Sequence, residues 1–466
     1  MSELRRDSLS FVEALGQSVA NVSPTFTPAL AVSVVAGMAS TASWLVFLCA
    51  TIAMVIVGIN VGKLAARIPS AGSFFIYVSR SLGASYGMLA GWAMLLAYSF
   101  TAMSLLVATS IFIKTLMTAF GVTAVIPNTA IYLVLSVGIF FLAYRDVRFS
   151  SRIGLTLESI SMVVILVVCI VTWAKLGFAV DMKQVHLEGA DTKSVALAVV
   201  FAIFSFVGFE SAATLGKETR NPKVAIPRAV ILTPILSGLF FIFTTYVIIF
   251  GFADDAEKLG NSATPLSDLT ASVAGWATIP VFLGAAISAF ACALASLNAF
   301  SRMLFSLGRY QFVHRSMGFV HDGHKTPHRA LALGAVFIFG VTAFWAGQDE
   351  TAMVGYYGTL ATFGFVFVYM LCSLAAPVLL RREGVAKIGD YIFGGLGALL
   401  MLAVLVGSIF PVPDYPNNLW PYCFIAYMLV GGAWFLVLKL RMPQALLAIE
   451  HDLEVTEIPH LGKIEA

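Results

Sequence analysis

The sequence contains few charged residues. Only 11% of its 466 residues are Asp, Glu, Lys or Arg, whereas 59% are hydrophobic. A soluble globular chain usually carries about 25% charged residues. Because lipid, but not water, can surround so apolar a surface, the composition indicates an integral membrane protein in contact with a lipid bilayer. The net charge of +3 gives no reason to expect a nucleic-acid partner.

Cysteine and histidine are also scarce. The five cysteines are isolated and form no CxxC pair, so we predict neither a disulfide framework nor a metal site. The seven histidines lie outside the apolar stretches. Four share one basic loop that we interpret as solvated, because no cysteine or paired carboxylate accompanies them: His314, His321, His324 and His328.

Signatures of catalysis and of nucleotide binding are missing. The sequence has no HExxH motif and no phosphate-binding loop, which argues against a zinc hydrolase and an ATP-driven pump. A GxSxG match at residues 83–87 opens an apolar helix instead of following a strand, so we interpret it as chance. We therefore expect no enzyme activity, no catalytic residues, no metal and no cofactor.

Long apolar stretches are abundant. About 20 apolar residues cross the hydrocarbon core as a helix, and these runs are too long and too continuous for strands. We predict an all-α membrane protein with about twelve transmembrane helices, near 11–37, 42–66, 85–117, 127–145, 151–174, 194–214, 227–251, 275–306, 330–347, 352–380, 391–410 and 419–440.

Positive charge alternates between the loops that these spans define. With the N-terminus inside, only five of the 28 Lys and Arg residues fall on the outer side: Lys114, Lys175, Lys183, Lys193 and Lys258. Cytoplasmic loops carry an excess of Lys and Arg. The pattern predicts that both termini are cytoplasmic and, for a bacterial chain, that the protein lies in the inner membrane. No small-residue cleavage site follows a short apolar run, so we expect no cleaved signal peptide.

Two spans carry features that interrupt a helix. The first contains Pro24 and Pro28, which lack a backbone N–H and leave carbonyls without partners. The sixth contains Gly208 beside the acid Glu210. Breaks five helices apart are typical of inverted-repeat transporters with a site at mid-membrane, although kinks without function remain an alternative.

A second acid, Glu158, lies in the fifth span. A charge at the bilayer centre is costly, so such an acid is paired, faces a cavity or carries a proton. Glu158 and Glu210 are therefore candidates for proton coupling. Alternatively, each acid only hydrogen bonds a neighbouring helix, or Glu158 lies near the cytoplasmic mouth close to Arg152. Weaker candidates for the pathway or an ion site are Tyr98, Tyr356, Tyr357, Ser288, Ser296 and Asn298.

Three stretches carry a resemblance to a known family. They are residues 62–77 after the second span, residues 204–229 around the sixth, and residues 295–328 at the end of the eighth. Together with the span layout, they resemble the amino acid–polyamine–organocation transporter family over nearly the whole chain. The resemblance implies a LeuT-type fold with inverted five-helix repeats at 11–174 and 194–380, two further helices at 391–440, and cytoplasmic termini at 1–10 and 441–466.

The resemblance also implies a binding site at the two breaks. In the family, the first break offers amides to a substrate carboxylate and the second offers carbonyls to its amine. The matching positions here are Ser23, Pro24, Thr25, Phe26 and Thr27, with Ser205, Phe206, Val207, Gly208 and Glu210.

The first break departs from the family pattern. Many members have a glycine-rich break, whereas this chain has Ser-Pro-Thr-Phe-Thr, and Pro24 removes an amide donor. It resembles the branch with a proline break, which includes putrescine-type permeases. Some members place a lysine in the fifth span, where this chain has Glu158. We expect a secondary transporter that imports an amino acid with protons, or alternatively imports or exchanges a polyamine or another organic amine; a channel is less favoured.

Overall fold

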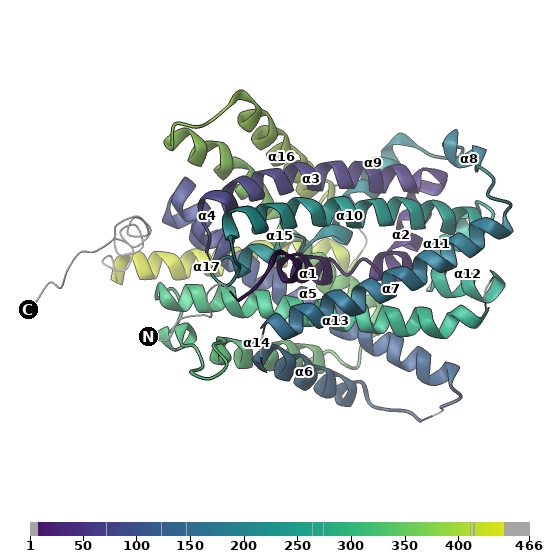
Figure 1. Ribbon diagram of the computed structural model, residues 1–466, viewed down its shortest axis with the longest axis horizontal. Helices are drawn as coiled ribbons and strands as arrows, with labels where there is room; N and C mark the ends of the chain where they lie inside the picture. Colours follow the sequence, from purple (N-terminus) through teal and green to yellow (C-terminus); the bar gives the residue numbers. More distant parts are fainter. Residues whose placement is uncertain are drawn as a thin grey trace, which may run out of the picture.

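Helices build the part of the chain that the structure describes. The computed structural model describes residues 8–70, 72–122, 124–145, 147–262, 264–273, 275–410, 412 and 415–441. Within these ranges the only β pairing is one isolated bridge between Leu9 and Thr219. The predicted all-α class is therefore confirmed (Figure 1). Most of the predicted N-terminal segment and nearly all of the predicted tail, residues 1–7 and 442–466, lie outside the described residues.

The helical segments follow the predicted spans, with ends shifted by a few residues. The label η marks a short 3₁₀ or π turn, and α marks an α-helix. In chain order they are α1 (Phe11–Val22), η1 (Thr27–Ala31), α2 (Val32–Ala39), η2 (Ser40–Ala42), α3 (Ser43–Arg67), α5 (Ala84–Ala119), α6 (Asn128–Arg145), α7 (Val147–Lys175), α9 (Thr192–Ala202), η3 (Ile203–Phe206), η4 (Ser211–Leu215), α10 (Pro222–Gly251), η5 (Gly275–Ala277), α13 (Thr278–Arg309), α14 (His328–Phe344), α15 (Glu350–Arg382), α16 (Ile388–Gly407), η7 (Asn417–Leu419) and α17 (Trp420–Arg441).

Short elements mark the two ends of the helix bundle. At one end, here called the α4 end, lie α4 (Ser73–Leu82) and η6 (Arg315–Gly318). At the other, the α8 end, lie α8 (Met182–Val185), α11 (Ala256–Gly260) and α12 (Pro265–Val273) (Figure 1).

Ten segments of the described chain are long and apolar enough to cross a membrane. The first of them, Phe11–Arg67, holds α1, α2 and α3 together, and α14 is a shorter apolar helix. Every predicted span thus corresponds to apolar helical structure, while the count of twelve crossings stays a prediction.

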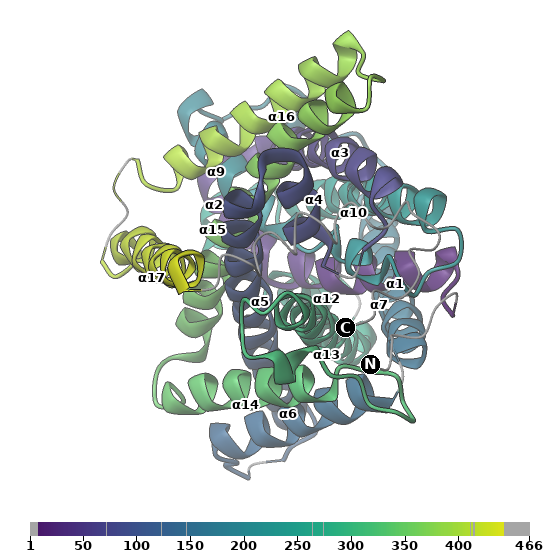
Figure 2. The same cartoon turned by 90° about the vertical axis from the view of Figure 1, so that its left-hand side faces the viewer.

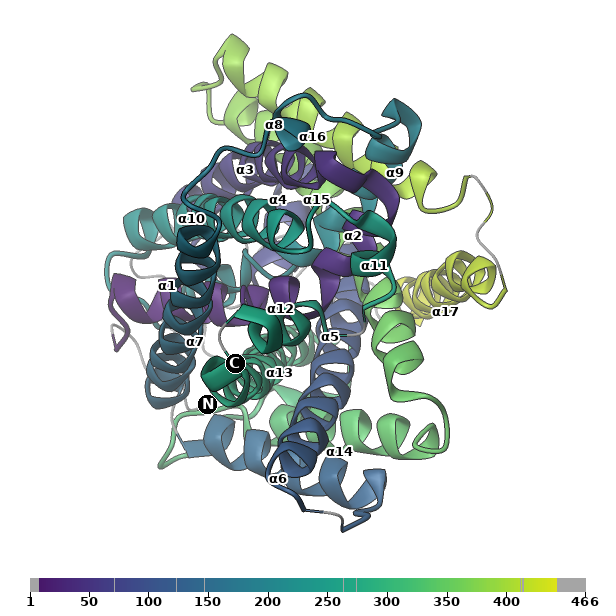
Figure 3. The ribbon, with the colours of Figure 1, turned by 90° about the vertical axis from the view of Figure 1, so that its right-hand side faces the viewer.

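The helices divide into a buried interior and a periphery. In the most apolar stretch of α5, 83% of the residues are buried, compared with 17% for α17 and 22% for α16. Figures 2 and 3, which view the bundle from its two ends, place α16 and α17 at the outside and α5 and α13 within. Helices that are apolar all round and still exposed are suited to lipid contact.

At the α8 end, two backbones touch without side chains between them. A Cβ atom added to Gly260 of α11 would lie 2.9 Å from the Cα of Gly37 in α2. The two glycines therefore allow α2 and α11 to approach to backbone contact.

Candidate functional site

The first predicted break is present. Helix α1 ends at Val22, and Ser23 adopts a left-handed conformation with φ of 50°. Pro24 cannot donate the next helical hydrogen bond, so the regular ladder stops there. The chain resumes as the single π-type turn η1 and continues as α2. The break covers the predicted residues Ser23 to Thr27.

A carboxyl from another helix fills this break. Glu158 of α7 is fully buried, and its Oε1 accepts hydrogen bonds from the Thr25 amide at 2.9 Å and from the Thr25 hydroxyl at 2.8 Å. Beside it, the hydroxyls of Ser23 and Ser288 of α13 hydrogen bond at 2.7 Å. The two predicted elements, the first break and Glu158, therefore form one site.

The second break lies against the first. After η3, Val207 is extended and Gly208 has φ of +91°, a region that residues with a Cβ rarely adopt. A Cβ on Gly208 would lie 2.4 Å from the Asn21 side-chain nitrogen, and that nitrogen donates to the Gly208 carbonyl at 3.3 Å. The bare backbone of Gly208 is what lets the two breaks touch.

Two tyrosines clamp Glu210 beside the second break. Tyr98 of α5 donates to Glu210 Oε1 at 3.0 Å, and Tyr369 of α15 donates to Oε2. The Tyr369 hydroxyl also accepts the Gly208 amide at 3.2 Å. All three side chains are fully buried. The ion pairs found among the described residues involve neither Glu210 nor Glu158.

Two polar atoms at the first break have no hydrogen-bond partner within the described chain. They are Thr27 Oγ1 and Glu158 Oε2, and both are buried. Buried polar groups are nearly always satisfied. Each of these two atoms therefore has capacity for a further hydrogen bond at the first break.

The aromatic members of the predicted site pack against other hydrophobic residues. Phe206 packs its ring against Phe241 of α10, 5.1 Å between centroids, and Phe26 joins a hydrophobic cluster with α5 and α13. Ser205 and Val207 are buried at the second break. All ten predicted binding residues thus lie in or next to the two breaks.

The alternative place for Glu158, near Arg152, does not describe this structure. Arg152 pairs with Glu13 of α1, with 2.5 Å between Nε and Oε1. Of the weaker candidates, Tyr98 contacts Glu210, Ser288 bonds Ser23 in the first break, and Ser296 bonds Asn21 in the last turn of α1 before it. Tyr356 and Tyr357 make ring contacts with Trp420 and Phe100. Tyr369 was not anticipated, because the sequence does not show which tyrosine of an apolar helix faces the site.

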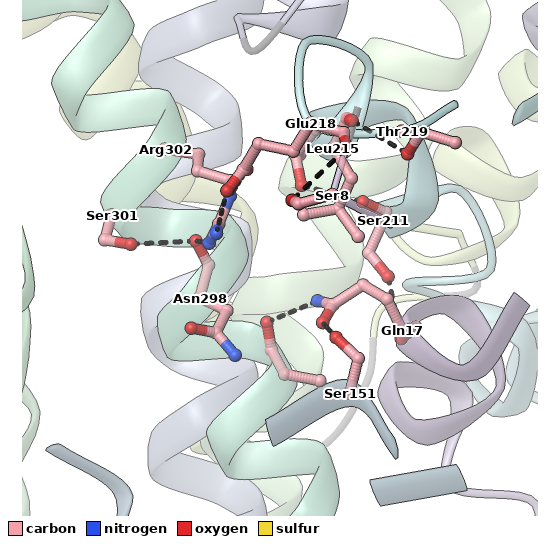
Figure 4. Close-up of polar contacts among 12 residues, drawn as sticks. Ser8, Gln17, Ser151, Ser211, Leu215, Glu218, Thr219, Asn298, Ser301 and Arg302 are labelled. Atoms are coloured by element: carbon pink, nitrogen blue, oxygen red, sulfur yellow. Dashed lines mark hydrogen bonds and ion pairs between the residues drawn. The ribbon is translucent and has the colours of Figure 1, made fainter. Parts of the chain in front are cut away.

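A tightly bonded seam closes the α4 end below the breaks. The guanidinium of Arg302 in α13 donates to both carboxylate oxygens of Glu218, at 2.7 and 3.2 Å, and both side chains are at most 2% exposed (Figure 4). The backbone around Glu218 also pairs with the start of the chain, through Ser8, Leu9 and Arg220. The seam joins the segment before α1, the segment after η4, and α13.

The bundle holds a buried polar site between two broken helices, an arrangement typical of membrane transporters. A family model described as "Amino acid permease" matches residues 15–438. The chain belongs to the amino acid permease family, and a transporter of amino acids or amines is the class this supports.

Named relatives differ in substrate and direction. The chain is 25% identical over 327 residues to the low-affinity putrescine importer PlaP of Escherichia coli K12, covering 68% of this chain and 70% of that one. It is 24% identical over 360 residues to the branched-chain amino acid permease BcaP of Bacillus subtilis, covering 72% and 73%. It is 25% identical over 432 residues to the L-methionine/branched-chain amino acid exporter YjeH of Escherichia coli K12, covering 90% and 92%.

Proposed function

We propose that this permease is a secondary active transporter that imports an amino acid together with protons, by alternating access, and that the substrate binds between the two helix breaks. The observation that carries the proposal is the insertion of the Glu158 carboxyl into the first break, where it bonds Thr25. A group that changes charge at this point can alter how α1 packs on α7, and α1 borders the substrate site.

The second break supplies the amine side of the proposed site. Partial negative charge gathers at helix C-termini, and η3 ends at the break next to Glu210. The tyrosine clamp holds Glu210 in place, so a substrate ammonium would meet a carboxyl whose position is already fixed. Exchange of a tyrosine hydrogen bond for a substrate ammonium would couple binding to the packing of α5 and α15.

Glu158 is the proposed proton carrier. It is buried, its Oε2 has no hydrogen-bond partner among the described residues, and the ion pairs described do not include it. A carboxyl in this setting can hold one proton without a counter-ion, and its release would leave a carboxylate still stabilised by the two Thr25 donors.

The setting of the proposal is a cell membrane with both termini in the cytoplasm. The support is the excess of Lys and Arg in the loops assigned to that side. On this assignment the α4 end faces the cytoplasm and the α8 end faces outward.

A second candidate substrate, a polyamine or another organic amine, is favoured by the hydrogen bonding of the first break. Pro24 has no N–H, and the amides of Ser23, Thr25 and Phe26 are engaged by Val19, Glu158 and Ser23. Few donors are left there for a substrate carboxylate. Two acids at the two breaks would in turn suit a cation without a carboxylate.

A binding screen separates the two candidates. Purified protein is heated with amino acids and their decarboxylated amines side by side: leucine with isopentylamine, and ornithine with putrescine. Stabilisation by the amino acid alone supports the first candidate, and stabilisation by the amine alone supports the second. Proton coupling is then tested in proteoliposomes with an imposed pH gradient, and uptake that follows a sodium gradient instead would contradict it.

A further inference from the structure

One face of α1 carries a regular stripe of buried polar side chains. Glu13, Gln17 and Asn21 lie four residues apart on α1, and Thr25 follows four residues later, inside the break. Each of the four is at most 1% exposed. Residues spaced by four occupy one face of a helix, about 5–6 Å apart. The stripe ends at Glu158, to which Thr25 is bonded.

Hydroxyls and carbonyls from neighbouring helices border the two middle positions of the stripe, Gln17 and Asn21. Gln17 donates to the Ala295 carbonyl at 2.9 Å and accepts from the Ser151 hydroxyl at 3.4 Å (Figure 4). Asn21 accepts from the Ser296 hydroxyl at 2.6 Å. The stripe is thus a continuous polar line along the contact of α1 with α7 and α13.

A charge pair closes the far end of the line. Glu13 bonds Arg152, and while Glu13 is 1% exposed, the Arg152 side chain is 57% exposed. Glu13 also accepts the Ser10 amide at 2.8 Å, which caps α1. The line therefore runs from the buried carboxyl of Glu158 to the buried carboxylate of Glu13, whose partner Arg152 is exposed at the α4 end.

Small residues keep the line closed in this conformation. A Cβ on Gly16 would lie 2.9 Å from the Leu155 Cβ, and one on Gly154 would lie 3.1 Å from the Ala20 Cβ. The backbones of α1 and α7 are therefore in close contact. A small outward tilt of α1 would separate them along the whole stripe.

We propose that this polar stripe is the route by which a proton leaves Glu158 for the cytoplasm, with the Glu13–Arg152 pair as its inner gate. The proposal rests on the proposed proton coupling through Glu158. When α1 tilts, one water fits between successive stripe positions, because two hydrogen bonds of about 2.8 Å span the ~5.6 Å of one helical turn. The amides order these waters and do not carry the proton themselves. Arg152 first separates from Glu13. The Glu158 O–H bond then breaks and leaves a carboxylate, the proton passes along the waters and hydroxyls to form an O–H bond on Glu13, and Glu13 releases it to solvent and pairs with Arg152 again.

The test uses the full-length protein in proteoliposomes and separates proton movement from substrate movement. Gln17→Leu removes the polar centre of the stripe at similar volume, and Gln17→Asn keeps an amide there. Ser161→Ala is the matched control, because Ser161 lies on α7 about one turn from Glu158 in the direction away from Gln17, and its hydroxyl donates to the Gly284 carbonyl at 3.0 Å. Labelled putrescine and leucine are the probes, in counterflow at equal pH and in accumulation driven by a pH gradient.

We expect Gln17→Leu to lower gradient-driven accumulation about tenfold, with counterflow close to that of the unmodified protein. Gln17→Asn should restore accumulation, and Ser161→Ala should behave like the unmodified protein. An equal loss in both assays would show a structural role for Gln17 and overturn the route, as would normal accumulation by Gln17→Leu.

A parallel Glu158→Gln variant distinguishes failure of the proposed proton carrier, Glu158, from failure of the proposed route along the stripe. If Glu158→Gln accumulates normally, proton coupling through Glu158 fails, and the route fails with it. If Glu158→Gln loses accumulation while Gln17→Leu retains it, the carrier stands and only the route is wrong.

Discussion

The contact between the two breaks is tested most directly by Gly208→Ala. The added methyl would lie 2.4 Å from the Asn21 side-chain nitrogen and 3.0 Å from the Asn21 carbonyl oxygen. It would also occupy a backbone conformation with φ of +91°. The clash with Asn21 pushes α1 away from the second break, and the positive φ strains the backbone of that break.

The magnitude follows from these two effects. A non-glycine residue in a sparsely populated backbone region costs about 1–3 kcal/mol. Overpacking a filled core costs about 1–3 kcal/mol more. Gly208→Ala should therefore destabilise the protein by roughly 2–6 kcal/mol and misalign the Gly208 amide that bonds Tyr369.

The assay is thermal unfolding of the purified protein, followed by probe binding. The melting temperature should fall by several degrees, and binding should weaken because Tyr369 no longer holds Glu210 in place. Gly355→Ala is the control, since no atom lies within 4 Å of the new methyl in α15 and alanine is the better helix former.

A second variant tests the clash with the Asn21 side chain separately from the backbone strain. Asn21→Ser in the Gly208→Ala background shortens the side chain nearest the methyl, so it should recover part of the loss. The carbonyl contact and the backbone strain remain, so recovery cannot be complete. A Gly208→Ala protein that melts and binds like its parent would show that the breaks do not meet as described.

Three further predictions concern charge. Glu210→Gln should weaken binding of amines without a carboxylate more than binding of neutral amino acids; equal losses in a binding titration would indicate a structural role only. Arg302→Met should cost about 3–5 kcal/mol by leaving Glu218 buried without its cation, and adding Glu218→Gln should recover most of the lost thermal stability; the reasoning is wrong if the double variant is no better. Burial and the neighbouring Asp181 carboxylate raise the pKa of Asp254, outside the helices, to about 6. Because this folded pKa exceeds the ordinary value, the stabilisation is complete below about pH 4 and is lost as pH rises through about 6. Hydrogen exchange of α8 should therefore be faster at about pH 7.5 than at about pH 5 after correction for intrinsic rates, and Asp254→Asn should abolish the difference.

Much of the fold follows from the sequence because the bilayer constrains it strongly. An apolar run long enough to span must satisfy its own backbone, so helices and their approximate ends are predictable from hydropathy alone. The breaks are predictable for the same reason: Pro24 cannot donate, and Gly208 offers no side chain. Both appear where the sequence places them.

Contacts between distant residues are less accessible to such reasoning. The sequence shows that Glu158 lies in an apolar helix, but not that it bonds Thr25, 133 residues away. Tyr369 resembles any other aromatic residue of α15 until the fold brings it to Glu210. The stripe on α1 has a period of four that is visible in the sequence, yet its meaning depends on which helices pack against it.

The two ends of the molecule are held by contacts of different chemistry. At the α8 end, the glycine contact of α2 with α11 is dispersion between bare backbones, in which each atom pair contributes only about 0.1–0.2 kcal/mol. At the α4 end, the Arg302–Glu218 pair is dry, and separating it strands two charges before water can reach them. Parting α2 from α11 should therefore cost much less free energy than parting the ion pair. For the alternating access proposed above, we expect the empty transporter to rest open on the α8 side, and the bound substrate to supply the energy that separates the ion pair at the α4 end.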